Sequence, residues 1–262
     1  MINKLDSSRY QSILDYIGSC RIDVSPYIIL NLSNYDAIKD YYSFYCQIID
    51  GAYTAFISVY SNVVQLWANE KVDVSEMKAF ILDKNIEAIY AIPELLNLMG
   101  LKINKKGKIL CLNQLIEIDH LCDYKISKKP SEDDYKTIAN LLVNDPESDS
   151  HSNETVTAQR YKTRNLEKKG RSYVLYDPNK EVIAHAGTHG ESKKIAIIGG
   201  VITKGDHRGK GMATCLVREL CNDLIVEGKN VYLYSFNPVA IGLYKKIGFV
   251  DLYDWGYADL KK

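Results

Sequence analysis

Residues 204–213 combine glycines and cationic side chains at a spacing that suits an anion. The segment, Lys-Gly-Asp-His-Arg-Gly-Lys-Gly-Met-Ala, follows an apolar run and precedes apolar residues at helical spacing. The first amides of a helix have no intrahelical acceptor and lie at the positive end of the helix dipole, so they can bind a phosphate. Gly209 and Gly211 would let the main chain approach this group, and Arg208 and Lys210 would add positive charge. The sequence predicts a phosphate-binding loop here, although a solvated basic turn also fits.

Two widespread phosphate loops do not match this segment. A Walker loop needs four residues between its glycines, but Gly205 and Gly209 are one residue too close, and Gly211 replaces the hydroxyl that binds magnesium. A dinucleotide fingerprint needs a third glycine at Thr214 and an acidic residue after the next strand, and neither is present. Nucleotide hydrolysis and nicotinamide binding are therefore not expected.

A second motif follows after the apolar run NVYLYSF. Residues 237–249 are Asn-Pro-Val-Ala-Ile-Gly-Leu-Tyr-Lys-Lys-Ile-Gly-Phe, and residues 208–213 contain Arg-x-x-Gly-x-Ala. This pair of motifs resembles the GNAT superfamily of N-acetyltransferases. The acetyl-CoA loop of that family is [Arg/Gln]-x-x-Gly-x-[Gly/Ala], and its next helix carries Asn-x-x-Ala-x-x-Leu-Tyr-x-x-x-Gly-Phe. The resemblance covers residues 121 to about 260, whereas the first 120 residues carry neither motif.

The resemblance implies transfer of an acetyl group from acetyl-CoA to an amine by direct attack within a ternary complex, without a metal ion. Main-chain groups of the strand before the loop would hold the pantetheine arm, and the loop amides would hold the pyrophosphate. Asn237 would bond the cofactor arm, although a simple helix cap also explains it. The cofactor-binding residues implied in this way are Val201, Ile202, Thr203, Arg208, Gly209, Lys210, Gly211, Met212, Ala213, Thr214, Asn237 and Tyr244.

Two of these residues are also implied in the chemistry. The N–H of Val201 would stabilise the oxyanion that develops on the thioester carbonyl, and Tyr244 would protonate the departing CoA thiolate. Tyr244 is one of 20 tyrosines, and a tyrosine on a short amphipathic helix also fits a core position.

The general base departs from the family pattern. Many members place a glutamate a few residues before the oxyanion donor, where this chain has Ile197 and Ile198. His185 is a candidate base, because it would lie opposite these residues if the strands paired about Gly190. A buried structural histidine, a water relay and an already neutral amine remain open, and His189 and Glu191 are expected at the hairpin tip. The missing glutamate also leaves a second function open, a CoA-responsive binding or regulatory module.

The elements around these motifs predict an α/β fold of the α+β type. We expect a GNAT-like mixed, mostly antiparallel twisted sheet flanked by helices in residues 121–262, preceded by a smaller α/β domain in residues 1–120. In the catalytic domain the pattern predicts a strand at 122–128, helices at 132–143 and 154–168, and a three-stranded meander before the loop. Residues 131 and 134 approximate a capping box.

The first 120 residues are rich in strand-forming side chains. Strands are expected in the runs that begin at Tyr27, Tyr41 and Ala52, with a tight turn at Asp50-Gly51. A helix over residues 74–84, a short strand, a helix that begins near Pro93 and a basic hairpin at 104–108 follow. Both halves share an order of strands, helix, strand and short helix, so the first half is interpreted as a degenerate acetyltransferase-like domain.

Composition limits the partners. The 262 residues carry 33 basic and 33 acidic side chains, so no long-range field attracts nucleic acid or an anionic membrane. No apolar run reaches the ~20 residues of a membrane helix, and the six cysteines are expected as reduced thiols, which together favour a cytoplasmic protein. The acceptor is expected to be a small-molecule or peptide amine, and a homodimer stays open.

Overall fold

The computed structural model describes residues 1–19, 24–34, 42–117, 124–146 and 153–261. The chain forms two compact units, which are described separately: unit 1 contains Met1–Lys108 and Tyr253–Lys262, and unit 2 contains Ile109–Leu252. Two strands, β6 (Lys105–Leu112) and β11 (Phe249–Asp259), have residues in both units. The division at residue 120 stays a prediction about domains.

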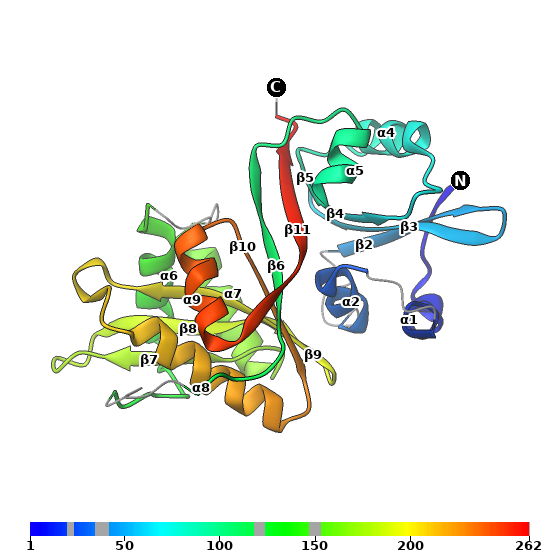
Figure 1. Ribbon diagram of the computed structural model, residues 1–262. Helices are drawn as coiled ribbons and strands as arrows, with labels where there is room; N and C mark the ends of the chain where they lie inside the picture. Colours follow the sequence, from blue (N-terminus) through cyan, green and yellow to red (C-terminus); the bar gives the residue numbers. More distant parts are fainter. Residues whose placement is uncertain (20–23, 35–41, 118–123, 147–152, 262) are drawn as a thin grey trace. The chain divides into compact units, whose positions relative to one another are not determined.

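Unit 2 is built on a mixed sheet with the strand order β11-β6-β10-β9-β8-β7 (Figure 1). Strands β7, β8 and β9 form the antiparallel meander that the sequence predicts, and β10 runs parallel to β9. The elements in chain order are α6 (Asp134–Asn144), α7 (Glu154–Leu166), β7 (Ser172–Tyr176), β8 (Val182–Glu191), β9 (Ile195–Thr203), the 3-10 helix η2 (Gly205–His207), α8 (Met212–Val226), β10 (Asn230–Ser235) and α9 (Pro238–Ile247).

Helices cover both faces of this sheet. The apolar residues of α8 and α9 pack with one set of strand residues, and Met212, Leu216, Leu220 and Leu224 on α8 are buried there as their spacing predicts. Helices α6 and α7 pack against the other face, where Ile138 and Tyr161 contact strand residues that include Val174.

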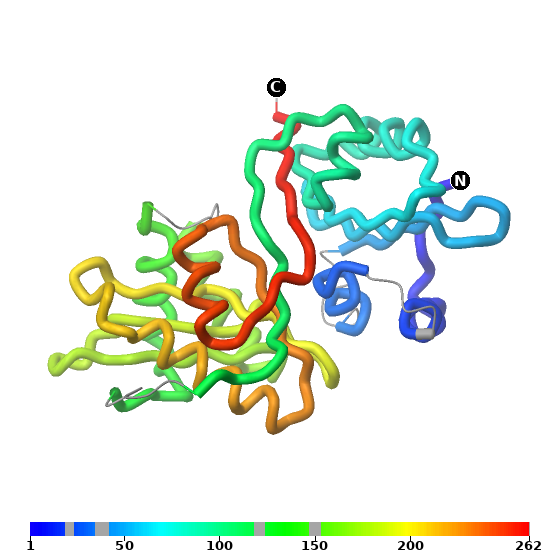
Figure 2. Tube along the Cα trace, in the orientation of Figure 1, coloured from blue at the N-terminus to red at the C-terminus, as the bar shows by residue number. Residues whose placement is uncertain are grey.

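Unit 1 has the strand order β1-β2-β3-β4-β5-β11. Its β4 and β5 are parallel and are connected through α4, just as β9 and β10 are connected through α8. The Cα trace in Figure 2 follows both connections. The elements are β1 (Ile2–Lys4), the 3-10 helix η1 (Ser7–Arg9), α1 (Tyr10–Ser19), α2 (Pro26–Ser33), β2 (Tyr42–Ile49), β3 (Ala52–Tyr60), β4 (Val63–Ala68), α4 (Val74–Asp83), β5 (Ala88–Ala91) and α5 (Pro93–Leu98).

Two local predictions are confirmed in detail. Asp50 and Gly51 have φ of 50° and 77°, the two positive values that a type I′ hairpin turn requires. Before α6, the amide of Ser131 donates to the Asp134 carboxylate, while the Asp134 amide donates to Ser131 Oγ at 3.3 Å, which is a reciprocal capping box.

Three local predictions are wrong. The run from Tyr27 is the helix α2, because Pro26 occupies its first turn and the apolar side chains at 28 and 32 pack together with α1. The basic segment 104–108 enters the single strand β6 and does not turn back. Among residues 124–128 only the bridge between Ser127 and Val174 is sheet structure, and the start of that predicted strand lies outside the described residues.

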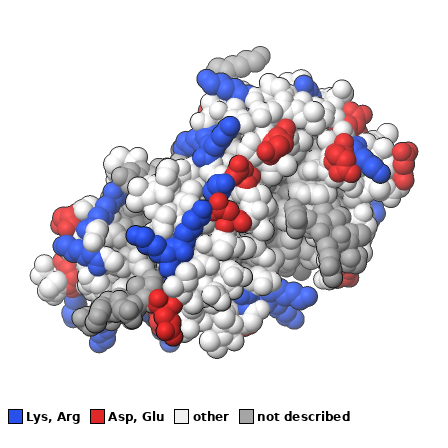
Figure 3. Space-filling model, viewed as in Figure 1, with Lys and Arg blue, Asp and Glu red and all other residues white. Residues whose placement is uncertain are grey.

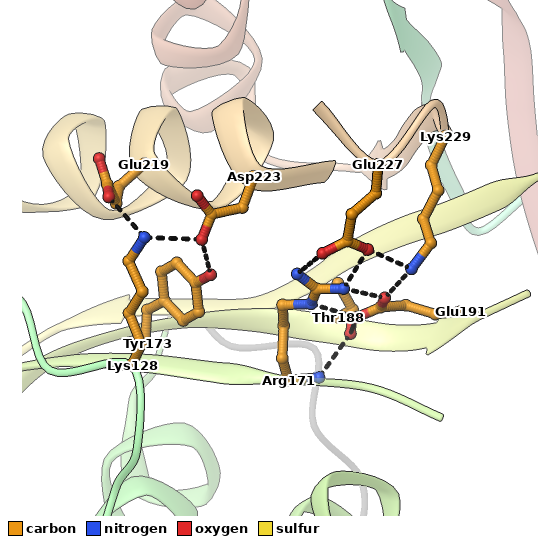
Figure 4. Close-up of polar contacts among 9 residues, drawn as sticks. All are labelled: Lys128, Arg171, Tyr173, Thr188, Glu191, Glu219, Asp223, Glu227 and Lys229. Carbon is orange, nitrogen blue, oxygen red and sulfur yellow. Dashed lines mark hydrogen bonds and ion pairs between the residues drawn. The ribbon is translucent and has the colours of Figure 1, made fainter. Parts of the chain in front are cut away.

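A charged network joins the start of β7, the end of β8 and the end of α8 in unit 2 (Figure 4). Arg171 donates to both Glu191 oxygens at 2.8 and 2.6 Å and to both Glu227 oxygens at 2.7 Å. Lys229 pairs with the same two carboxylates, and Thr188 Oγ1 donates to Glu191 at 2.9 Å. The network fixes the end of the β8–β9 hairpin against the C-terminal end of α8.

The remaining global features concern charge, membranes and thiols. Basic and acidic side chains are interspersed on the face shown in Figure 3, consistent with the balanced net charge. No helix among the described residues has the length and apolarity needed to cross a membrane. Cys46, Cys111 and Cys221 are free thiols, but Cys215 is disulfide-bonded, so the prediction of reduced thiols is wrong at Cys215.

Candidate active site

The site begins where two parallel strands separate. Strands β9 and β10 pair at Ile195 with Asn230, Ala196 with Val231 and Ile197 with Tyr232, although β9 continues to Thr203 and β10 to Ser235. No further pair of these two strands is found among the described residues. The edge of β9 that β10 leaves uncovered therefore offers main-chain groups to a ligand.

A β-bulge interrupts β9 within this uncovered stretch. On β8, His185 pairs with Ile202 and Gly187 pairs with Gly199, so Gly200 and Val201 lie opposite a single residue of β8. Gly200 has φ of +64°, a left-handed conformation that favours glycine. The bulge includes Val201, the residue predicted as the oxyanion donor.

The loop at the N-terminus of α8 has the geometry of an anion site. Gly209 and Gly211 have φ of +73° and +79°, and a Cβ at either position would meet no atom within 4 Å. The first helical bond runs from the Cys215 amide to the Gly211 carbonyl at 3.0 Å, and no acceptor for the amides of residues 209–214 is found among the described residues. Open space beside unpaired amides fits a diphosphate.

The two basic side chains of the loop act on the protein itself. Arg208 Nε donates to the Thr203 carbonyl at 3.1 Å, and its guanidinium pairs with Asp145. Lys210 Nζ donates to the Asp206 carbonyl at 3.2 Å. These contacts brace the loop, a role that the expectation of simple counter-charge does not include.

Asn237 and Gly248 define the two ends of α9. Asn237 Oδ1 accepts from the amides of Val239 and Ala240 at 2.9 and 3.3 Å, so the helix-cap interpretation is confirmed, and its Nδ2 group is not used by the cap. Gly248 has φ of +119°, and a Cβ there would overlap the Gln114 carbonyl oxygen. This overlap explains the glycine near the end of the motif.

Tyr244 lies on α9 inside the core of unit 2. Its side chain is buried and its ring centroid is 5.9 Å from that of Phe249. Burial, with a smaller effect of Cys221, raises the pKa of the phenol. No hydrogen bond to its hydroxyl is found among the described residues. The phenolic proton of Tyr244 is therefore not donated to any of these residues.

His185 lies elsewhere than the predicted register places it. The hairpin turn is at residues 192–194, not at Gly190, and His185 therefore pairs with Ile202 instead of Ile197 or Ile198. It is fully buried, and its Nδ1 is 2.6 Å from the Gly200 carbonyl oxygen. Burial lowers the pKa of the imidazole to about 4, against a smaller opposite effect of the Gly200 contact.

Two further side chains lie at the bulge: Tyr161, which no sequence motif indicates, and His189, which was expected at the hairpin tip. The Tyr161 ring of α7 packs edge-on to His185 with centroids 5.1 Å apart, and a Cβ at Gly200 would overlap its hydroxyl. The ring of His189 occupies the space that a Cβ at Gly199 would need, so it does not lie at the hairpin tip. Burial first, and then nearby arginines, lower the pKa of His189 to about 3. The only sequence signal is the glycine pair inside a strand.

The family comparison fits this geometry. Residues 135–249 match the model of the acetyltransferase (GNAT) family. The match begins in α6 and ends at the first residue of β11. No curated protein matches the chain in sequence. The family uses acetyl-CoA as its cosubstrate, which agrees with the predicted role of the α8 loop.

Solved structures show the same fold over the whole chain. A GNAT-family acetyltransferase from Colwellia psychrerythraea has a TM-score of 0.64 at 13% identity and covers 100% of both chains. A tandem GNAT protein of the clavulanic acid biosynthesis pathway has a TM-score of 0.64 at 11% identity, covering 100% of this chain and 99% of that one. A GCN5-related N-acetyltransferase from Sphaerobacter thermophilus has a TM-score of 0.64 at 13% identity, covering 100% of this chain and 96% of that one. The predicted fold class is therefore confirmed.

Proposed function

We propose that this protein transfers the acetyl group of acetyl-CoA to a primary amine on a small molecule or peptide. The observation that carries the proposal is the uncovered edge of β9, which leads directly into a loop whose amides at 209–214 have no acceptor within the described part of the chain. An extended pantetheine arm can pair with main-chain groups of Val201–Thr203, while the diphosphate binds at the α8 N-terminus.

The transfer is a single displacement within a ternary complex. The amine nitrogen attacks the thioester carbonyl, the oxygen gains negative charge, and the C–S bond breaks as the amide forms. The Val201 N–H stabilises the charged oxygen, and the Tyr244 hydroxyl gives its proton to the CoA sulfur. Asn237 contributes its Nδ2 group to the cofactor arm.

The proton that the amine loses needs an acceptor, and this chain lacks the strand glutamate that serves many family members. The positions where family members carry a glutamate are Ile197 and Ile198, which are 0% and 2% exposed. An amine that arrives neutral still loses one proton when the amide forms. A water relay can carry this proton to Tyr244, whose own proton has gone to the CoA sulfur, so the protons balance without a side chain at positions 197 and 198. A neutral amine predicts that the rate rises with pH until the acceptor itself is deprotonated.

Calorimetry with CoA and acetyl-CoA tests the binding step. We expect binding to the full chain with a favourable contribution from the diphosphate, so that dephosphorylated pantetheine binds more weakly. The absence of any binding at millimolar CoA would overturn the proposal.

Release of free thiol tests the chemical step. The protein is mixed with acetyl-CoA and a panel of small-molecule amines and N-terminal peptides, and CoA is measured with a thiol reagent. Acceptor-dependent release supports the transferase. Because the family glutamate is missing, the second candidate is a CoA-responsive regulatory module, for which CoA binds but no acceptor increases thiol release.

A further inference from the structure

One hydrogen bond connects a buried histidine to the strand at the centre of the proposed site. His185 Nδ1 lies 2.6 Å from the carbonyl oxygen of Gly200, and the side chain is 0% exposed. A carbonyl oxygen only accepts, so Nδ1 carries the proton in this contact. The other nitrogen, Nε2, is buried and has no hydrogen-bond partner among the residues that the structure describes.

This arrangement does not suit a general base. A base must reach the proton that it removes, directly or through one water molecule. The Nε2 atom is instead buried beside Gly187 of β8, where a Cβ would lie only 3.0 Å from it. The contact that His185 does make is directed at β9.

The Gly200 carbonyl belongs to the same peptide unit as the Val201 N–H. The peptide is planar and trans, as are all peptides in the described chain, so its C=O and N–H point in opposite directions. A donor that fixes the carbonyl oxygen therefore also fixes the direction of the N–H. Hydrogen bonds in series polarise one another, so the donation from His185 also strengthens the Val201 N–H as a donor.

The peptide needs such support because it lies in the bulge. Residues 200 and 201 have lost the regular ladder to β8, and β10 does not pair with them. Gly200 is in a left-handed conformation, and Tyr161 packs beside both Gly200 and His185. The side chains of His185 and Tyr161 therefore support the Gly200–Val201 segment, which lacks regular ladder hydrogen bonds.

We infer that His185 is a positioning residue, which orients the Gly200–Val201 peptide so that its N–H points at the thioester oxygen of acetyl-CoA. The inference rests on the proposed function and assigns His185 a role different from that of a base. Removal of the His185 N–H should weaken the polarisation of the thioester carbonyl and lower turnover, while the main contacts with the CoA diphosphate remain.

Infrared difference spectra of acetyl-CoA labelled with carbon-13 at the carbonyl test this role without an acceptor. In the wild type we expect the carbonyl band to move to lower frequency on binding. His185→Asn places an amide N–H near the position of Nδ1 and should keep most of that movement, whereas His185→Phe keeps a ring without a donor and should lose it. Affinity for CoA should change by less than about threefold in both variants, since the diphosphate site is elsewhere.

Turnover gives a second readout. With any acceptor found in the thiol assay, His185→Phe should lower kcat by about 10- to 100-fold, less than the loss of a whole oxyanion donor, while His185→Asn stays within about fivefold. Tyr176→Phe is the matched control, because it removes a half-buried hydrogen bond of 2.7 Å to Asp134 in the same unit but away from the bulge. It should leave the band and kcat unchanged.

The outcomes separate the role of His185 from the proposed function. If the wild type does not bind acetyl-CoA, the proposed function fails. If it binds and His185→Phe shows the wild-type band, the positioning role is wrong. Equal loss of kcat in the Asn and Phe variants, with the band unchanged, indicates a base instead. Should His185→Phe not fold, nitrogen-15 NMR of the wild type decides, because a proton on Nε2 instead of Nδ1 contradicts the inference.

Discussion

At the scale of single residues, Tyr244 has the properties of an acid and not of a nucleophile. Burial raises its pKa above the ordinary value of a phenol, so the hydroxyl keeps its proton at neutral and mildly alkaline pH. A thiolate that leaves acetyl-CoA is a stronger base than the neutral amide product and can take this proton. Tyr244 should therefore contribute no alkaline limb to the pH–rate profile below pH 9.

Tyr244→Phe removes this proton and little else. The ring contact with Phe249, at 5.9 Å between centroids, can persist in the variant. We expect kcat to fall by about 10- to 100-fold, because the thiolate must then leave unprotonated. CoA affinity from calorimetry should stay within about twofold, and unchanged turnover would remove Tyr244 from the mechanism.

At the scale of elements, carboxylates near the end of α8 make the stability of the fold depend on pH. Hydrogen bonds from Arg171 lower the pKa of Glu227 to about 2. Burial alone would raise the pKa of Glu191, but Arg171 and Lys229 outweigh it and the net shift is downward. A lowered pKa contributes stability above about pH 4.3, the unfolded value, and this contribution is lost as the pH falls toward 2.

Glu227→Gln should therefore flatten the acid side of the stability curve. We expect the melting temperature of the wild type to fall between pH 4.5 and pH 2 more steeply than that of the variant. Glu181→Gln is the control, because Glu181 is 65% exposed and its ion pair with Lys204 is 3.5 Å long. Thermal melts monitored by circular dichroism measure the three curves, and parallel curves for wild type and Glu227→Gln would refute the assignment.

The glycine at the start of α8 allows a comparison with the glycine at its end. Gly211 and Gly228 have φ of +79° and +74°, and a Cβ would meet open space at both. Alanine should cost about 1 kcal/mol of stability at each position, because both conformations are left-handed. Only Gly211→Ala should weaken CoA binding, by about tenfold or more, because its Cβ would lie in the diphosphate loop. Equal CoA affinity of the two variants in calorimetry would contradict this site.

The elements that the sequence predicted well are those with local chemical causes. The type I′ turn at Asp50-Gly51, the capping box before α6 and the apolar face of α8 each depend on residues within a few positions. The strand predicted from Tyr27 failed because tertiary packing decides the state of a short apolar run. The predicted position of His185 was wrong because the hairpin turns at residues 192–194 and not at Gly190, while the two bulges between β8 and β9 offset each other before His185 is reached. The sequence does not show that Tyr161, from α7, packs at the second bulge.

At the scale of the whole molecule, the two units share an order of elements but differ in the residues at the N-terminus of the connecting helix. In both, a helix connects two parallel strands, α4 in unit 1 and α8 in unit 2. The α8 N-terminus carries glycines, and its first amides find no acceptor in the ranges of the chain that are described. The α4 N-terminus is capped by Asp73, whose Oδ1 accepts from the Glu76 amide at 3.0 Å. The Glu76 carboxylate in turn accepts from the amide of Ile2 and from Gln47.

This difference predicts one CoA molecule for each chain. Asp73 already accepts from one N-terminal amide of α4, and the carboxylates of Asp73 and Glu76 would repel a diphosphate, so the shared order of elements does not create a second site. Calorimetry with the full chain should give a stoichiometry near one, and Gly211→Ala should weaken that single binding event without revealing another. Gly228→Ala should keep the wild-type stoichiometry and affinity. Two equivalents bound by the wild type, or a site of wild-type affinity that survives Gly211→Ala, would show that unit 1 binds CoA by contacts other than a helix N-terminus.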